Sequence, residues 1–148
     1  MPALLVACDG GPVPSADTLT IYSLKSTRGS ALIEGPPPPG FELIQNQYPI
    51  LGKYEVTDAA ERRKIIVALN QAMLSASGPK KCFNPRHAFR IESGGKTIEY
   101  VVCFQCGNYE AKNTSPERGA IAGSAQPFFD DLLKNAGVPL NPGQGEAE

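Results

Sequence analysis

The chain has 148 residues, 41% hydrophobic and 20% charged, a composition typical of a globular domain that buries its own core. Its formal net charge of −1 provides no electrostatic field that would attract a polyanion, so we expect no nucleic-acid partner. No apolar run reaches the ~20 residues that a membrane-spanning helix needs. The composition thus argues against nucleic-acid binding and against a helical membrane span, and it leaves other partners unknown.

Residues 5–8, L-V-A-C, have the pattern of a bacterial lipobox, in which small residues lead into a cysteine that becomes lipidated. This interpretation makes Cys8 the lipid-bearing residue and residues 1–17 a signal remnant and tether. The protein is then located in the cell envelope, lipid-anchored or periplasmic, and touches a membrane only through the lipid on Cys8. The alternative is a coincidence, because no Lys or Arg precedes Cys8 as a signal's charged region requires. In that case the chain is cytoplasmic.

The first two predicted strands are residues 18–24, T-L-T-I-Y-S-L, and 48–56, Y-P-I-L-G-K-Y-E-V, which are rich in β-branched and aromatic side chains. A helix follows, because Asp58 and Glu61 have the spacing of a capping box. Its apolar side chains recur at intervals of three and four residues, as one buried helix face requires. That predicted face consists of Ile65, Ile66, Leu69, Ala72 and Met73.

A hairpin is predicted over residues 86–104, with strands at 86–92 and 97–104. Two glycines between the strands supply the positive φ of a tight turn. A polar, loop-like stretch then runs from residue 108 to about 123. The last predicted helix begins at Ser124 as its N-cap. Its predicted buried stripe is Phe128, Phe129, Leu132, Leu133 and Ala136.

These elements predict a single domain over residues 18–140, followed by a disordered tail at 141–148 that has little to pack. The predicted fold class is α+β. It consists of a mostly antiparallel sheet that contains the Gly-Gly hairpin, with two amphipathic helices packed on one face.

Three of the four cysteines and the single histidine lie in two short segments, C-F-N-P-R-H at 82–87 and C-F-Q-C at 103–106. Pairing across the glycine turn brings both segments to the same end of the hairpin. Two registers fit the sequence: in the first, Glu92 faces Thr97, and the second is shifted by one residue. In either one, Cys82 and Cys106 become near neighbours, within reach of the Cα separation of about 5.5–6 Å that a disulfide prefers.

This cluster has three chemical interpretations. Cys82, His87, Cys103 and Cys106 form a candidate zinc site, since thiolates and imidazole are the ligands that zinc prefers. A disulfide between Cys82 and Cys106 is natural in an exported protein and makes no use of His87. Cys103 and Cys106 could instead be a thiol redox pair, which would make the chain an enzyme.

The sequence favours a structural cluster over a catalytic one, so we expect a non-enzymatic protein with no catalytic residue and either no cofactor or zinc. Two arginines beside the cluster, Arg86 and Arg90, are candidates for binding an anion. Cross-strand pairing of Arg90 with Glu99 is the interpretation that we favour.

Several segments resemble an uncharacterised family of small bacterial proteins, many of them predicted lipoproteins. The resembling segments are I-Y-S-L at 21–24, Y-P-I-L-G-K-Y-E-V at 48–56, C-F-N-P-R-H at 82–87, V-V-C-F-Q-C at 101–106 and Q-P-F-F-D-D-L-L-K-N-A-G-V-P-L at 126–140. The two cysteine-containing segments are the most specific part of the resemblance. The family has no assigned activity, so the resemblance implies an envelope location and no reaction.

Overall fold

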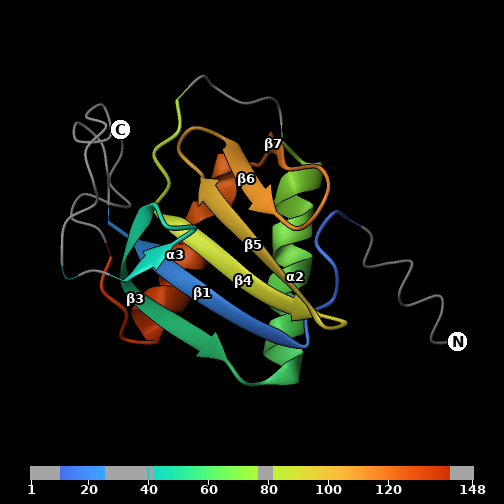
Figure 1. Cartoon of the computed structure of the whole chain (residues 1–148), viewed down its shortest axis with the longest axis horizontal. Coiled ribbons are helices and arrows are strands. Elements are labelled where there is room, and N and C mark those ends of the chain that lie inside the picture. The colour runs from blue at the N-terminus through green and yellow to red at the C-terminus, as the bar shows by residue number, and fades with distance from the viewer. Residues whose placement is uncertain (1–10, 26–39, 41, 77–81, 141–148) are drawn as a thin grey trace, which may run out of the picture.

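The computed structural model describes residues 11–25, 40, 42–76 and 82–140. In this part of the chain, seven strands form one sheet in the order β2-β3-β1-β4-β5-β6-β7, and all neighbouring strands are antiparallel (Figure 1). The strands are β1 (Thr18–Leu24), β2 (Leu43–Ile44), β3 (Tyr48–Val56), β4 (His87–Ser93), β5 (Lys96–Cys103), β6 (Asn108–Lys112) and β7 (Arg118–Ala120). The helices are α2 (Ala59–Leu74), the short 3-10 helix η1 (Gly123–Ala125) and α3 (Gln126–Asn135).

The predicted α+β fold class, with two helices packed on one face of a sheet, is wrong. The molecule is mainly an antiparallel sheet that curls into a half-barrel, and its two α-helices have only 16 and 10 residues. The stretch from 108 to 123, predicted as a loop, contains the two strands β6 and β7. Because neighbouring strands are rotated in the same sense, each added strand increases the total twist, so seven strands do not form a flat layer.

The strongest strand predictions are confirmed. β1 and β3 have the predicted bounds, and the hairpin of β4 and β5 turns at Gly94-Gly95, where both glycines have positive φ. Its register places Glu92 opposite Thr97, the first of the two registers that the sequence allowed. These segments are predictable because their side chains have high β-propensity and their turn needs glycine.

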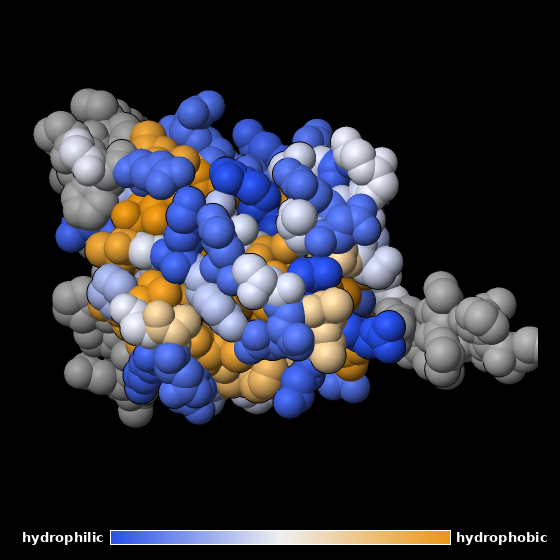
Figure 2. Space-filling view, turned by 90° about the horizontal axis from the view of Figure 1, so that it is seen from below, coloured by the Kyte–Doolittle hydropathy of each residue, from blue (hydrophilic) through white to orange (hydrophobic). Residues whose placement is uncertain are grey.

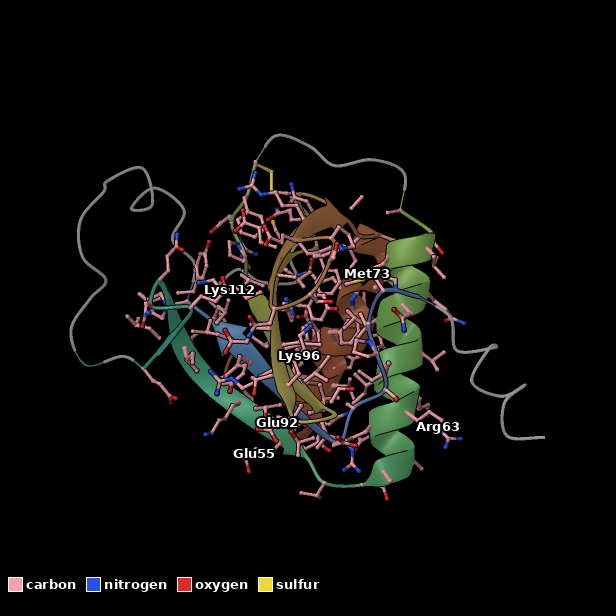
Figure 3. The ribbon with its side chains drawn as sticks, turned by 45° about the vertical axis from the view of Figure 1, so that its right-hand side comes forward. Glu55, Arg63, Met73, Glu92, Lys96 and Lys112 are labelled. Carbon is pink, nitrogen blue, oxygen red and sulfur yellow. A yellow bond between two sulfur atoms is a disulfide. The ribbon has the colours of Figure 1, made fainter. Side chains whose placement is uncertain are left out.

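The first helix is also confirmed. The Asp58 side chain accepts a hydrogen bond from the Glu61 amide at 2.8 Å, as the capping spacing predicted. All five predicted face residues of α2 are buried. Figure 3 shows Arg63 on the outer side of this helix, directed away from the sheet.

The predicted buried stripe of α3 is partly wrong. Phe129 and Leu133 are buried as predicted and Leu132 is partly buried, but Phe128 is 37% exposed and Ala136 is exposed. The polar residue Asp130 is buried instead. The helix also begins without a side-chain cap, because its N-cap residue is Ala125 rather than Ser124.

Side chains on both faces of the hairpin strands are buried, and they belong to two separate cores. Phe89, Ile91 and Val102 belong to the main core, which also contains side chains of α2 and α3. Ala88 and Val101 point to the opposite face and belong to a second, smaller core with β2 and β3. Burial on both faces explains why the end of β5 is continuously apolar.

The packed part of the chain begins before Thr18. Val13 is buried in the main core, and its backbone N–H and C=O both bond to the Asn70 side chain, at 2.8 and 2.9 Å. The predicted lipidation site, Cys8, and the predicted disordered tail at 141–148 lie outside the described residues. Residues 11–17, which the sequence assigned to a tether, therefore include a segment fixed against α2.

Among the described residues, no helix is long and apolar enough to cross a membrane. In the view from below, hydrophilic residues are spread over the surface and apolar side chains are visible between them (Figure 2).

Candidate functional site

The candidate site lies where β4 begins and β5 ends. His87 is the first residue of β4 and pairs with Val102 in β5. Cys103 is the last residue of β5, and Cys106 lies in the turn that leads into β6. Antiparallel pairing thus brings both cysteine-containing segments together at one end of the sheet, as the sequence predicted.

Cys82 and Cys106 are joined as a disulfide, with their Cα atoms 5.7 Å apart (Figure 3). This separation lies within the range that disulfides prefer, so the prediction that the two residues become near neighbours is confirmed. The Asn108 side chain donates a hydrogen bond to the Cys82 carbonyl at 3.0 Å and ties this segment to β6. Of the two bonded cysteines, Cys82 is exposed to solvent, whereas Cys106 is only 3% exposed.

The turn after β5 is closed by Gly107. Its N–H lies 2.9 Å from the Cys103 carbonyl oxygen and 3.2 Å from that of Phe104. Its φ of 75° is in the left-handed region, which glycine adopts without a steric cost. In the same turn, the Cys106 amide donates to Cys103 Sγ at 3.2 Å. Cys103 is a free thiol and is buried.

His87 and Asp130 form a buried pair. His87 Nε2 lies 2.8 Å from Asp130 Oδ1, and the two side chains are only 1% and 6% exposed. The second carboxylate oxygen accepts a hydrogen bond from Gln126 Nε2 at 3.3 Å. The imidazole ring also packs edge-on against Phe104, with ring centroids 5.0 Å apart. The pair therefore fixes the start of β4 to α3.

Asp130 and Gln126 are site residues that the sequence analysis missed. Helical periodicity placed Asp130 beside the apolar stripe of α3, where a carboxylate is expected to face solvent. The available signal was the Gln126–Asp130 spacing of four residues, which puts both polar side chains on one helix face. That spacing does not indicate that the face meets the one histidine of the chain.

Arg86, His87 and Cys103 border one small hollow of about 10 Å³, together with Asn84, Phe104, Gln105 and Gln126. Ligand pockets for small molecules usually have volumes of about 300–1,000 Å³. The hollow has room for about one water molecule. A wider groove of about 340 Å³ runs along one side of α3, from Ser124 before the helix, past Asp130, to Lys134 in its last turn.

The four residues of the candidate zinc site are not gathered around one point in this structure. Cys82 and Cys106 are bonded to each other, and His87 Nε2 contacts Asp130. Within the described residues, no group of three or more His, Cys, Asp or Glu side chains is placed to hold a metal ion. Because zinc binds thiolates and not a disulfide, the zinc interpretation concerns the reduced protein and stays a prediction.

The two arginines have different surroundings. Arg90 Nε contacts Glu99 Oε2 at 2.8 Å, as the favoured cross-strand interpretation predicted, and its guanidinium lies over the Tyr22 ring at 5.3 Å. Burial raises the pKa of the Tyr22 phenol, and the Arg90 charge acts in the opposite direction. Arg86 is 8% exposed and lines the small hollow. An anion site made from Arg86 and Arg90 stays a prediction.

Comparison with known proteins adds no relative: no protein-family model, no curated protein and no solved structure matches this chain. The resemblance to the small bacterial family therefore stays a prediction, and the function has to be argued from the site itself.

Proposed function

We propose that this chain is a non-enzymatic domain of the bacterial cell envelope, and that its Cys/His cluster is structural. The observation that carries the proposal is the Cys82–Cys106 pair at disulfide distance, with Cα atoms 5.7 Å apart. Together with the His87–Asp130 pair, it connects the segment before β4, the turn after β5 and helix α3. These connections are made by side chains that are mostly buried, as a stabilising role requires.

The envelope location is supported by the chemistry of the disulfide. Disulfides persist in oxidising compartments, and cytosolic thiols are usually kept reduced. The lipobox pattern at residues 5–8 and the resemblance to predicted lipoproteins favour the same location. A lipid on Cys8 would hold the domain at a membrane surface.

The non-enzymatic character is supported by the surroundings of His87. A histidine that acts as a general base must reach the proton that it removes, but this one is 1% exposed and its Nε2 contacts a carboxylate. Ser23 is paired with His87 across β1 and β4 and is fully buried. Its hydroxyl makes no hydrogen bond within the described residues, so no serine–histidine contact of the kind that activates a nucleophile is formed.

The envelope proposal is tested by replacing the predicted lipidation site. Both proteins are produced in the organism from which the chain comes, and the lysates are separated into detergent and aqueous phases at the cloud point. We expect the wild-type protein in the detergent phase and the Cys8→Ser variant in the aqueous phase. Ser15→Ala is the matched control, because Ser15 is an exposed neighbour and should leave the partitioning unchanged. A wild-type protein in the aqueous phase, or a Cys8→Ser variant that stays with the detergent, would show that Cys8 carries no anchor.

A further inference from the structure

Three cysteines meet at the turn after β5. Cys106 is the buried cysteine of the disulfide, and its backbone amide donates a hydrogen bond to the free Cys103 thiol at 3.2 Å. The only free cysteine of the described residues therefore lies against a residue whose sulfur is already oxidised. This backbone contact places a nucleophile next to the residue whose disulfide it can attack.

The turn geometry suits a bond between Cys103 and Cys106. The hydrogen bond from the Gly107 amide to the Cys103 carbonyl closes a single helix-like turn. Residues three apart on a helical turn have Cβ atoms about 5–6 Å apart, and a disulfide needs about 3.5–4.5 Å. A small tightening of this turn brings the two sulfurs into bonding distance, and Gly107 gives the turn a residue that tolerates such a change.

Exposure favours one direction of reaction. Cys103 and Cys106 are 1% and 3% exposed, whereas Cys82 is exposed. A thiolate is better solvated at the surface than in the interior, so Cys82 is the sulfur that leaves most readily. After it leaves, the thiol that appears is the one that other molecules can reach.

We propose that the Cys103 thiol exchanges with the Cys82–Cys106 disulfide. Cys103 gives its proton to water, and the thiolate attacks Cys106 Sγ. The Cys103–Cys106 bond forms, the Cys82–Cys106 bond breaks, and the electron pair leaves on the Cys82 sulfur, which takes up a proton from water. One disulfide and one thiol are present before and after the step, so no external oxidant or reductant is required.

The exchange replaces a long-range connection with a local one. The Cys82–Cys106 bond spans 24 residues and holds the segment before β4 to the turn, whereas the Cys103–Cys106 bond lies within the turn. The exchanged form therefore releases that segment and presents Cys82 as an accessible thiol, which can exchange with a disulfide carried by a partner. If no exchange occurs, the structural role proposed above is unaffected, because that role depends only on the Cys82–Cys106 bond.

Trypsin separates the two forms. Cleavage after Lys81, Arg86, Lys96 and Lys112 gives peptide 82–86, which contains Cys82, and peptide 97–112, which contains Cys103 and Cys106. Before exchange, the two peptides are linked by the disulfide, and the thiol reagent N-ethylmaleimide can label only Cys103. After exchange, peptide 82–86 is free and labelled, and peptide 97–112 is lighter by two hydrogens because of its internal disulfide.

The folded protein, carrying Cys8→Ser, is incubated with N-ethylmaleimide and sampled by mass spectrometry of non-reduced digests. Uncatalysed disulfide rearrangement takes minutes to hours, so we expect labelled Cys82 and internally linked 97–112 to accumulate over hours and become the main species. The matched control Cys103→Ser should keep peptides 82–86 and 97–112 linked throughout. Label confined to Cys103 in the parent protein, or no label at all, would overturn the proposal.

A second variant tests the exchanged state directly. In Cys82→Ser, an oxidising glutathione buffer should produce the internal Cys103–Cys106 disulfide and leave no free thiol in peptide 97–112. A Cys82→Ser protein that stays a dithiol, or that carries glutathione on Cys106, would show that the turn cannot hold the second bond and would also overturn the proposal.

Discussion

Reducing the Cys82–Cys106 disulfide is expected to lower the free energy of unfolding by about 3 kcal/mol. The bond closes a loop with a sequence separation of 24 residues, and loss of that closure gives the unfolded chain more conformations. For a chain of about this size, the change corresponds to a fall in melting temperature of roughly 6–12 °C. Thermal unfolding followed by circular dichroism, with and without reductant, measures it.

Cysteine variants separate this effect from general effects of the reductant. The double variant Cys82→Ser, Cys103→Ser, which leaves Cys106 as the only cysteine of the cluster, should show the same loss as reduction and should then be insensitive to reductant. Cys103→Ser removes a thiol outside the disulfide, so it should keep the full sensitivity. A wild-type protein whose melting temperature is the same in both buffers would contradict a structural role for the bond.

Replacing either member of the His87–Asp130 pair is expected to be strongly destabilising. His87→Ala and Asp130→Ala each leave a polar partner buried, which costs about 3 kcal/mol for pairs of this kind. The double variant should lose clearly less than the sum of the two, because neither group then remains alone. Chemical denaturation of the four proteins gives the coupling free energy.

The matched control for these variants is the ion pair of Arg90 and Glu99, which is more exposed than the His87–Asp130 pair. Arg90→Ala should cost about 1 kcal/mol, since the Arg90 side chain is 36% exposed and ion pairs that solvent reaches contribute little. Single variants at His87 and Asp130 that lose no more than Arg90→Ala, with additive effects in the double variant, would contradict a tight buried pair. From the sequence, a chain linked by the Cys82–Cys106 disulfide is expected to make no use of His87. The buried contact with Asp130 changes this expectation to a destabilising effect of His87→Ala.

The part of the fold that the sequence predicts is the part with strong local signals. β1 and β3 are rich in β-branched and aromatic residues, and the Gly94-Gly95 turn sets the hairpin register. By contrast, β6 has the sequence N-Y-E-A-K, in which only Tyr109 and Ala111 are buried. Such a short, polar strand forms because β5, which pairs with β4 on one side, offers its other edge for pairing, and that opportunity is not visible in the local pattern.

The candidate site also has one part that the sequence predicts and one part that it does not. Pairing of the hairpin strands follows from the sequence, so the approach of Cys82 to Cys106 was predictable. The partner of His87 was not, because Asp130 lies 43 residues away on a helix whose position depends on tertiary packing. Periodicity identifies an apolar face, but it does not identify which buried polar groups will meet across two elements.

We infer that Cys82 and Cys106 form a structural disulfide and do not serve as two of four zinc ligands. The most direct measurement is a non-reducing tryptic map of the native protein, purified without a His tag and alkylated during lysis, combined with zinc analysis of the same sample. We predict that most of peptide 82–86 is linked to peptide 97–112 and that zinc is far below one ion per chain. One zinc ion per chain, with Cys82, Cys103 and Cys106 all alkylated as free thiols, would contradict the account.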